Sequence, residues 1–124
     1  MKFTCEKNAL VSAISVASRT VAQKSTIPAL EGIYIRAGVN LTLSGYNLET
    51  GITISVDAEI QQTGACIMPS RLFFDIIRKL PGDTVSISVD EKFKVSIRGG
   101  ISSFSITAMS SEDYPELPEV ESDK

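Results

Sequence analysis

Three cations and one anion share one face of a predicted helix. Among the residues of the sequence, this group is the strongest candidate for a binding site. Arg71, Asp75 and Arg78 follow one another at intervals of four and three residues, with Lys79 beside them, so a helix brings them together. Such a face can contact phosphate groups without reading base sequence. The alternative is a solvated face with one Arg71–Asp75 ion pair, which contributes roughly a few tenths of a kcal/mol.

Most catalytic chemistry is missing from the sequence. There is no histidine, which removes the commonest general base and the commonest metal ligand of proteins. Neither of the glycine-rich phosphate-binding patterns of nucleotide enzymes occurs. The carboxylate pairs Asp90-Glu91 and Glu112-Asp113 fall in a predicted turn and in a tail, where solvated charge is expected. We therefore expect no catalytic residue, no metal site and no cofactor in this chain.

The two cysteines, Cys5 and Cys66, stand far apart and form no C-x-x-C pair. Neither a disulfide framework nor a cysteine zinc site is indicated. Both lie in apolar stretches, so we expect small core residues rather than reactive thiols.

The charge of the chain is divided unevenly. The formal net charge is -3, from 12 basic and 15 acidic side chains, and six of the acids fall in the last 13 residues. Residues 1–111 carry 11 basic and 9 acidic side chains, a net charge of +2. The folded body is therefore compatible with a polyanionic partner, and the acidic tail must be judged apart from it.

Hydrophobic periodicity predicts a strand, a helix and three strands in the first half. Phe3 and Cys5 alternate with polar residues, as in a strand with one buried face. A helix is expected from an Asn8 N-cap to about residue 21, and Ser25–Pro28 follows its end. The three strands are marked by Ile33 and Ile35, by Leu41 and Leu43, and by Ile52, Ile54 and Val56.

The same order of elements returns in the second half. Residues 65–68 form a short apolar strand, and Ser70 is a suitable N-cap for a helix over 71–80, which Pro81-Gly82 ends. Asp90-Glu91 and Gly99-Gly100 are the expected hairpin turns of three further strands. These strands are marked by Val85, Ile87 and Val89, by Phe93, Val95 and Ile97, and by Phe104, Ile106 and Ala108.

The order strand, helix, three strands thus occurs twice, over about 1–60 and 65–109, with low side-chain identity between the halves. Each helix has one apolar face, so we expect an α+β fold with both helices packed on one side of antiparallel sheet. The opposite faces of the helices then share one surface. Lys7, Arg19 and Lys24 add positive charge to it.

Phe104 and Ile106 lie on the last predicted strand between Ser103, Ser105 and Thr107. Ordinary core packing explains this alternation. A sheet edge that pairs with another domain or copy explains it as well. The residues alone leave both interpretations open.

The sequence carries no signal for a membrane. No apolar run approaches the roughly 20 residues that cross a bilayer, and the N-terminus lacks the apolar core of a signal peptide. We expect a cytoplasmic protein with no membrane partner.

Seven short stretches can be recognised together. They are Met1–Thr4, Lys24–Leu30, Asn47–Glu49, Pro69–Arg78, Leu80-Pro81, Phe104-Ser105 and Asp113–Pro118. Their order and spacing are those of the bacterial sliding clamps, the beta subunits of DNA polymerase III, so the chain resembles the N-terminal domain of that family. Each stretch alone is weak, but the ordered set spans essentially the whole chain.

The resemblance implies a clamp fold of two pseudo-symmetric β-α-β-β-β units. A family subunit has three such domains, and two subunits close head to tail into a ring around double-stranded DNA, with the helices lining the hole. The role implied is non-catalytic: the clamp tethers the replicative polymerase during DNA replication, and the polymerase and exonuclease activities reside in other subunits. Polymerase and clamp loader would bind through later domains absent from this chain.

The resemblance also assigns residues. Lys24 and Arg71 match basic residues that contact DNA, and Arg78 and Lys79 would face the hole. Lys24 stands where relatives often have arginine, which keeps the charge but loses the planar fork. Residues 1–118 would form the first domain, and residues 119–124 would begin the inter-domain connector.

Phe104 and Ile106 match apolar residues of the last strand that meet the third domain of the partner subunit, which favours the edge interpretation. The main rival hypothesis uses the same strand in a non-catalytic protein–protein interaction domain without nucleic acid. A small hydrolase is a third hypothesis, and the missing histidine counts against it.

Overall fold

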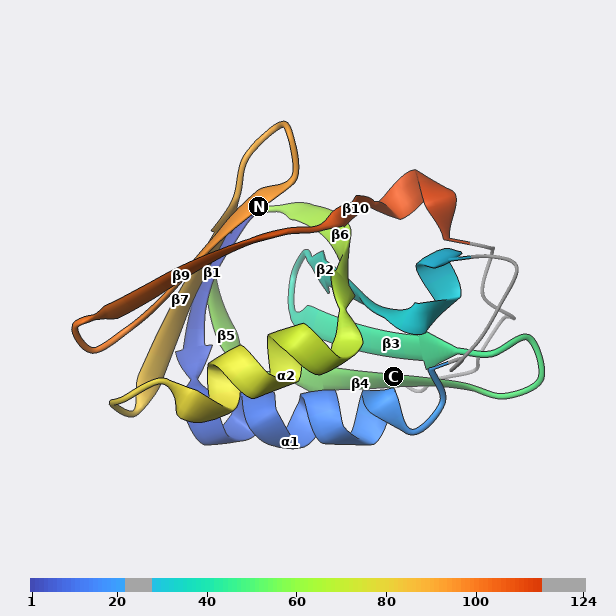
Figure 1. The fold of residues 1–124 in the computed structure, drawn as a ribbon, viewed down its shortest axis with the longest axis horizontal. Helices are drawn as coiled ribbons and strands as arrows, with labels where there is room; N and C mark the ends of the chain where they lie inside the picture. The colour runs from blue at the N-terminus through green and yellow to red at the C-terminus, as the bar shows by residue number, and fades with distance from the viewer. Residues whose placement is uncertain (22–27, 115–124) are drawn as a thin grey trace.

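Two α-helices lie side by side along one side of two antiparallel sheets in the computed structural model, which describes residues 1–21 and 28–114 (Figure 1). Short 3-10 turns cover Pro28–Glu31 and Ser111–Asp113. None of the described helices is long and apolar enough to span a membrane. The elements are β1 (Lys2–Glu6), α1 (Lys7–Ser18), β2 (Gly32–Ala37), β3 (Leu41–Tyr46), β4 (Gly51–Val56), β5 (Ala58–Gln62), β6 (Gly64–Pro69), α2 (Ser70–Lys79), β7 (Thr84–Val89), β8 (Lys94–Gly99), β9 (Ser102–Thr107) and β10 (Met109–Ser110).

The two repeated units exchange their first strands. One sheet has the order β5-β1-β7-β8-β9 and the other the order β10-β6-β2-β3-β4. Thus β1 of the first unit pairs with β7 of the second, with Cys5 opposite Val85, while β6 pairs with β2, with Cys66 opposite Ile35. The expected α+β fold of two β-α-β-β-β units is confirmed, and the exchange ties the two units into one domain.

The core lies between the helices and the inner faces of the sheets. Leu10 and Ile14 of α1 and Phe73 and Ile77 of α2 are completely buried. The two cysteines are core residues, as predicted. Burial raises the pKa of the Cys5 thiol to about 11, with a smaller contribution from the charge of Glu6, and burial raises the pKa of the Cys66 thiol to about 12.

The helix starts differ from the prediction. Asn8 does not cap α1: the helix begins at Lys7, directly after β1, and Glu6 at the cap position makes no side-chain capping bond. The N–H of Lys7 instead donates to the carbonyl of Asp83 at 2.8 Å. Ser70 is likewise the first residue of α2 rather than its cap. A strand that runs straight into a helix leaves no place for a capping loop.

The turn between β7 and β8 explains a second difference. The Asp90 carboxylate accepts hydrogen bonds from the backbone N–H groups of Lys94 at 2.9 Å and Lys92 at 2.8 Å, which lower its pKa. Phe93 was expected to begin the next strand, but it takes φ 62° within this turn. The Gly99-Gly100 turn is confirmed, with Gly100 at φ 59°.

Two strands were not expected from the sequence, β5 and β10. β5 follows β4 almost directly and pairs with β1 at the edge of the first sheet. β10 pairs with β6. The chain beyond β10 returns over the second sheet, where the Tyr114 ring stacks on Tyr34 with 5.2 Å between centroids.

Candidate functional site

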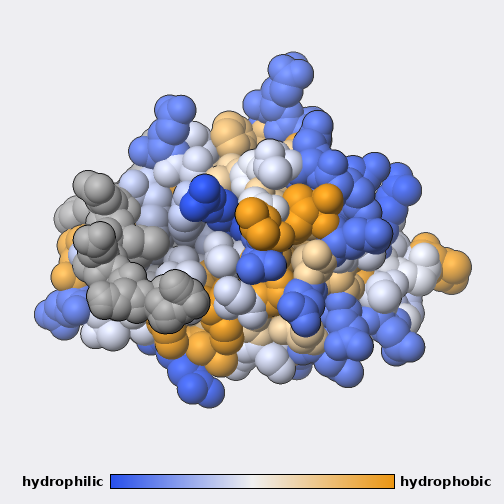
Figure 2. Space-filling view, turned by 180° about the vertical axis from the view of Figure 1, so that it is seen from behind, coloured by the Kyte–Doolittle hydropathy of each residue, from blue (hydrophilic) through white to orange (hydrophobic). Residues whose placement is uncertain are grey.

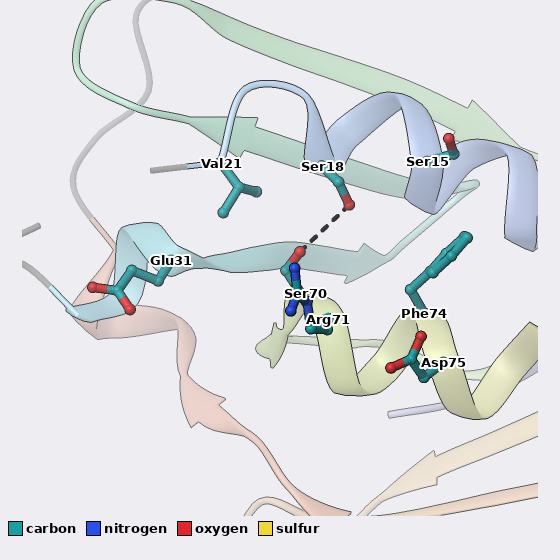
Figure 3. Close-up of a pocket in the computed structure, with 8 residues that line it drawn as sticks. All are labelled: Ser15, Ser18, Val21, Glu31, Ser70, Arg71, Phe74 and Asp75. Carbon is teal, nitrogen blue, oxygen red and sulfur yellow. Dashed lines mark hydrogen bonds between the residues drawn. The ribbon is translucent and has the colours of Figure 1, made fainter. Parts of the chain in front are cut away.

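The two helices border a groove of about 680 Å³. Figure 3 shows hydroxyl groups on both walls, and the Oγ atoms of Ser18 on α1 and Ser70 on α2 share a hydrogen bond at 3.4 Å across it. The bond is long and therefore weak, and it links the start of α2 to the end of α1. The groove is lined by Ser15, Ser18, Val21, Glu31, Ser70, Arg71, Phe74 and Asp75.

Arg71 is the cation best placed at this groove. It is the second residue of α2, its side chain is exposed, and it forms no ion pair or hydrogen bond with any described residue. The first turn of α2 holds no acidic residue and no side-chain cap, so its N–H groups leave a partial positive charge there. Cation and helix terminus together favour an anion at this end of the groove.

Asp75 does not pair with Arg71, which corrects the solvated-pair interpretation. Its carboxylate Oδ1 instead accepts a hydrogen bond from Nη2 of Arg78 at 3.5 Å, and both side chains are about half exposed. The Arg78 guanidinium also lies over the Phe74 ring, 5.5 Å from its centroid, a favourable cation–π geometry. The result is one arginine with two partners, Arg78, and one arginine without a partner among the described residues, Arg71.

The other predicted basic residues fall into three groups. Lys79 and Arg19 are exposed at the ends of the helices. Lys7 is tied down, because its Nζ donates to the carbonyl of Leu80 at 2.6 Å, and it therefore holds the end of α2. Lys24 lies outside the described residues.

Phe104 and Ile106 lie on β9. Among the described residues, β9 is the outermost strand of its sheet and pairs only with β8. Phe104 is 42% exposed, whereas Ile106 is partly buried against the core. These side chains face the core side of the sheet, and the strand lies at its edge. Pairing of this edge with another domain or copy stays a prediction.

Comparison with known proteins decides the family. Residues 1–118 match the family described as DNA polymerase III beta subunit, N-terminal domain. The chain belongs to this family. It is 34% identical to the beta sliding clamp of Staphylococcus epidermidis and 36% identical to that of Staphylococcus aureus, in each case over 99% of this chain and 35% of the relative. The chain thus spans about a third of the length of these clamps.

Solved sliding-clamp structures share the fold. A putative DNA polymerase III beta subunit from Eubacterium rectale has a TM-score of 0.94 at 31% identity, covering 100% of this chain and 34% of that chain. The DNA polymerase sliding clamp from Bacillus subtilis has a TM-score of 0.92 at 31% identity, over 98% of this chain and 34% of that chain. The duplicated clamp architecture is therefore that of the family.

A second groove of this clamp domain was missed from the sequence. It has a volume of about 590 Å³ beside α2 and β10, and Leu72 and Met109 in its wall are 48% and 37% exposed. Helical periodicity does show Leu72 outside the apolar stripe of α2, but nothing local brings Met109 to it. Four residues line this groove as well as the first: Glu31, Ser70, Arg71 and Asp75.

Proposed function

We propose that this chain is the first domain of a ring-shaped sliding clamp that encircles double-stranded DNA and tethers a replicative polymerase. The role is non-catalytic and confers processivity in DNA replication. Residues 1–118 form the domain, and residues 119–124 begin the connector to the next domain. Family membership and the fold support this proposal, and the names of the relatives describe them as sliding clamps.

The observation that carries the DNA contact is the paired-helix surface. Both helices lie on the same side of the two sheets (Figure 1), and the exposed Arg71 at their groove has no described partner. Arg71, Arg78, Lys79 and Lys24 contact phosphates, and neighbouring hydroxyls supply neutral donors. Such contacts are independent of base sequence.

Weak contacts suit this function. A closed ring cannot leave DNA sideways, so tethering does not depend on affinity, and tight phosphate contacts would hinder sliding. Arg78 already forms an ion pair with Asp75 and lies over the Phe74 ring. These contacts weaken its attraction for DNA phosphates. Water-mediated contacts with phosphates suffice for the other basic residues of this surface.

The subunit contact lies at the edge of the first sheet. Phe104 and Ile106 of β9 meet the third domain of a second subunit in a head-to-tail homodimer. The polymerase and the clamp loader bind later domains of the cytoplasmic protein. An apolar edge strand that no other described strand covers supports this assignment, because sheets rarely leave such an edge open.

Arg71→Ala in a full-length subunit tests the DNA contact. Removing one phosphate contact should lower the slope of log affinity against log salt by about 0.9 and weaken binding several-fold at low salt. The measurement is fluorescence anisotropy with duplex DNA across a salt series. Arg36→Ala, on an exposed site of β2, is the matched control and should bind as the unaltered protein. Equal binding by both variants would remove Arg71 from the site.

A further inference from the structure

We propose that Arg19 is a further phosphate contact of the paired-helix surface and that Gly45 on β3 holds it in place. The proposal rests on the proposed function, since it takes the paired helices to face DNA. It adds one binding residue at the end of α1 and one positioning residue, a glycine that lies on the sheet and touches no DNA itself.

Gly45 lies where the end of α1 meets the second sheet. It follows the buried Leu43 by two residues on β3 and pairs with Ile52 of β4. A Cβ on Gly45 would overlap with the carbonyl oxygen of Ala17 and would stand 2.5 Å from Oγ1 of Thr20. Because carbon atoms pack at about 3.5–4.0 Å, only glycine lets the end of α1 come this close.

The turn that rests on Gly45 is closed by bonds to the same carbonyl group. Ala17 and Thr20 are both buried. The Ala17 carbonyl oxygen accepts hydrogen bonds from the backbone N–H and from Oγ1 of Thr20, each at 3.2 Å. Arg19 lies between these two residues, and its backbone N–H donates to the carbonyl of Val16 at 3.2 Å. The backbone of Arg19 is therefore held on both sides.

Arg19 stands at the rim of the groove between the helices. Ser18 before it and Val21 after it both line this groove (Figure 3). The Arg19 side chain is exposed and forms no ion pair or hydrogen bond with any described residue. Hydrophilic residues are spread over much of the molecule, as the view from behind shows (Figure 2), so its place at the groove distinguishes Arg19 rather than its exposure. A guanidinium group there can donate two parallel hydrogen bonds to a phosphate.

A methyl group on Gly45 would displace this turn without changing any charge. The Ala17 carbonyl would have to move by about 1 Å to reach an ordinary contact distance. The Ser18–Ser70 hydrogen bond is already at 3.4 Å, so it is too weak to resist such a shift. Weaker DNA contact with every charge retained is therefore the signature of a positioning role for Gly45.

The experiment compares three variants of the full-length subunit by fluorescence anisotropy with duplex DNA across a salt series, at a temperature where circular dichroism shows each variant to be folded. Arg19→Ala should weaken binding several-fold at low salt and lower the slope of log affinity against log salt by about 0.9. Gly45→Ala should weaken binding by about twofold to fivefold, although it removes no charge. Gly38→Ala is the matched control, because a Cβ there meets nothing within 4 Å, and it should bind as the unaltered protein.

A double variant shows whether Gly45 acts through Arg19. Gly45→Ala combined with Arg19→Ala should bind as Arg19→Ala alone, because two changes that remove one contact are not additive. Full additivity would overturn the proposal, as would equal binding by Gly45→Ala and Gly38→Ala. If Gly45→Ala does not fold, Thr20→Ala loosens the same turn without adding bulk to β3. Thr20→Ala should then weaken binding, and unchanged binding would overturn the proposal.

Arg71→Ala separates this proposal from the proposed function. Weaker binding by Arg71→Ala together with unchanged binding by Arg19→Ala would overturn the roles of Arg19 and Gly45 and leave the proposed function standing. If both arginine variants bind as the unaltered protein, the DNA contact of the paired helices itself fails, and the roles of Arg19 and Gly45 fail with it.

Discussion

At the scale of single residues, Asp75 determines which arginine stays available. The spacing of four residues predicts a bond to Arg71, yet the carboxylate binds Arg78 three residues later. The reason is that Arg78 gains a second contact on the Phe74 ring, and a sequence pattern does not rank two arginines by such contacts. The residue types of the site were thus predictable, whereas their pairing was not.

Asp75→Asn is the corresponding test. Loss of the carboxylate removes the ion pair with Arg78 and one negative charge from the groove wall. We expect tighter binding of duplex DNA at low salt, by about twofold to fivefold, because an exposed pair of this kind contributes below about 1 kcal/mol. Anisotropy titration of the full-length protein measures it. Weaker binding by the variant would show that Asp75 helps rather than restrains the contact.

The buried thiols give a pH prediction. Cys5 and Cys66 have pKa values raised from 9.0 to about 11 and about 12, so between pH 9 and 11 the unfolded chain loses these protons while the folded chain keeps them. Stability is therefore full below pH 9 and falls as the pH rises, by on the order of 2 kcal/mol between about pH 8 and about pH 10 for both thiols together. Urea unfolding at the two pH values measures the fall.

The control for this prediction is the double variant Cys5→Ala, Cys66→Ala. It loses stability overall, but its pH dependence over the same range should be flatter than that of the unaltered chain. An equal slope for both proteins would mean that other groups cause the alkaline loss.

At the scale of the elements, the amphipathic helices and alternating strands were predictable, but their ends were not. α2 appears within one residue of its predicted range because Phe73, Ile77 and Leu80 form a clear apolar face. α1 begins before Asn8 because the backbone N–H of Lys7 donates to the carbonyl of Asp83, which lies far along the chain. β5 was missed because only Asp57 separates it from β4, so no turn sequence marks where one strand ends and the next begins.

Lys7 joins the two units through the end of α2, and Lys7→Met tests that role. The variant keeps the aliphatic stem but loses the ammonium that donates to the carbonyl of Leu80 at 2.6 Å. We expect a loss of about 1 kcal/mol in the free energy of unfolding, the usual contribution of such a bond. Urea denaturation provides the value. Lys92→Met, at an exposed turn, is the control, and an equal loss in both variants would argue against a specific anchor.

At the scale of the whole molecule, the duplication was visible in the order of elements, but the exchange of β1 and β6 between the sheets was not. Local periodicity indicates that Phe3 and Cys5 belong to a strand with one buried face. It does not indicate that this strand pairs with Ser86 and its neighbours, which lie about 80 residues further along the chain. The exchange ties the two units together and leaves β4 and β9 as the outermost strands of their two sheets among the described residues. Both helices lie along one side of these sheets (Figure 1).

The central claim is that the full-length protein holds DNA by enclosing it, and retention on circular against linear DNA tests it most directly. The full-length subunit is loaded by a bacterial clamp loader onto a nicked circular plasmid, isolated by gel filtration, and the plasmid is then cut once. We predict stable retention on the circle and release after cutting, because a ring slides off a free end. Equal retention on circular and linear DNA would contradict the account.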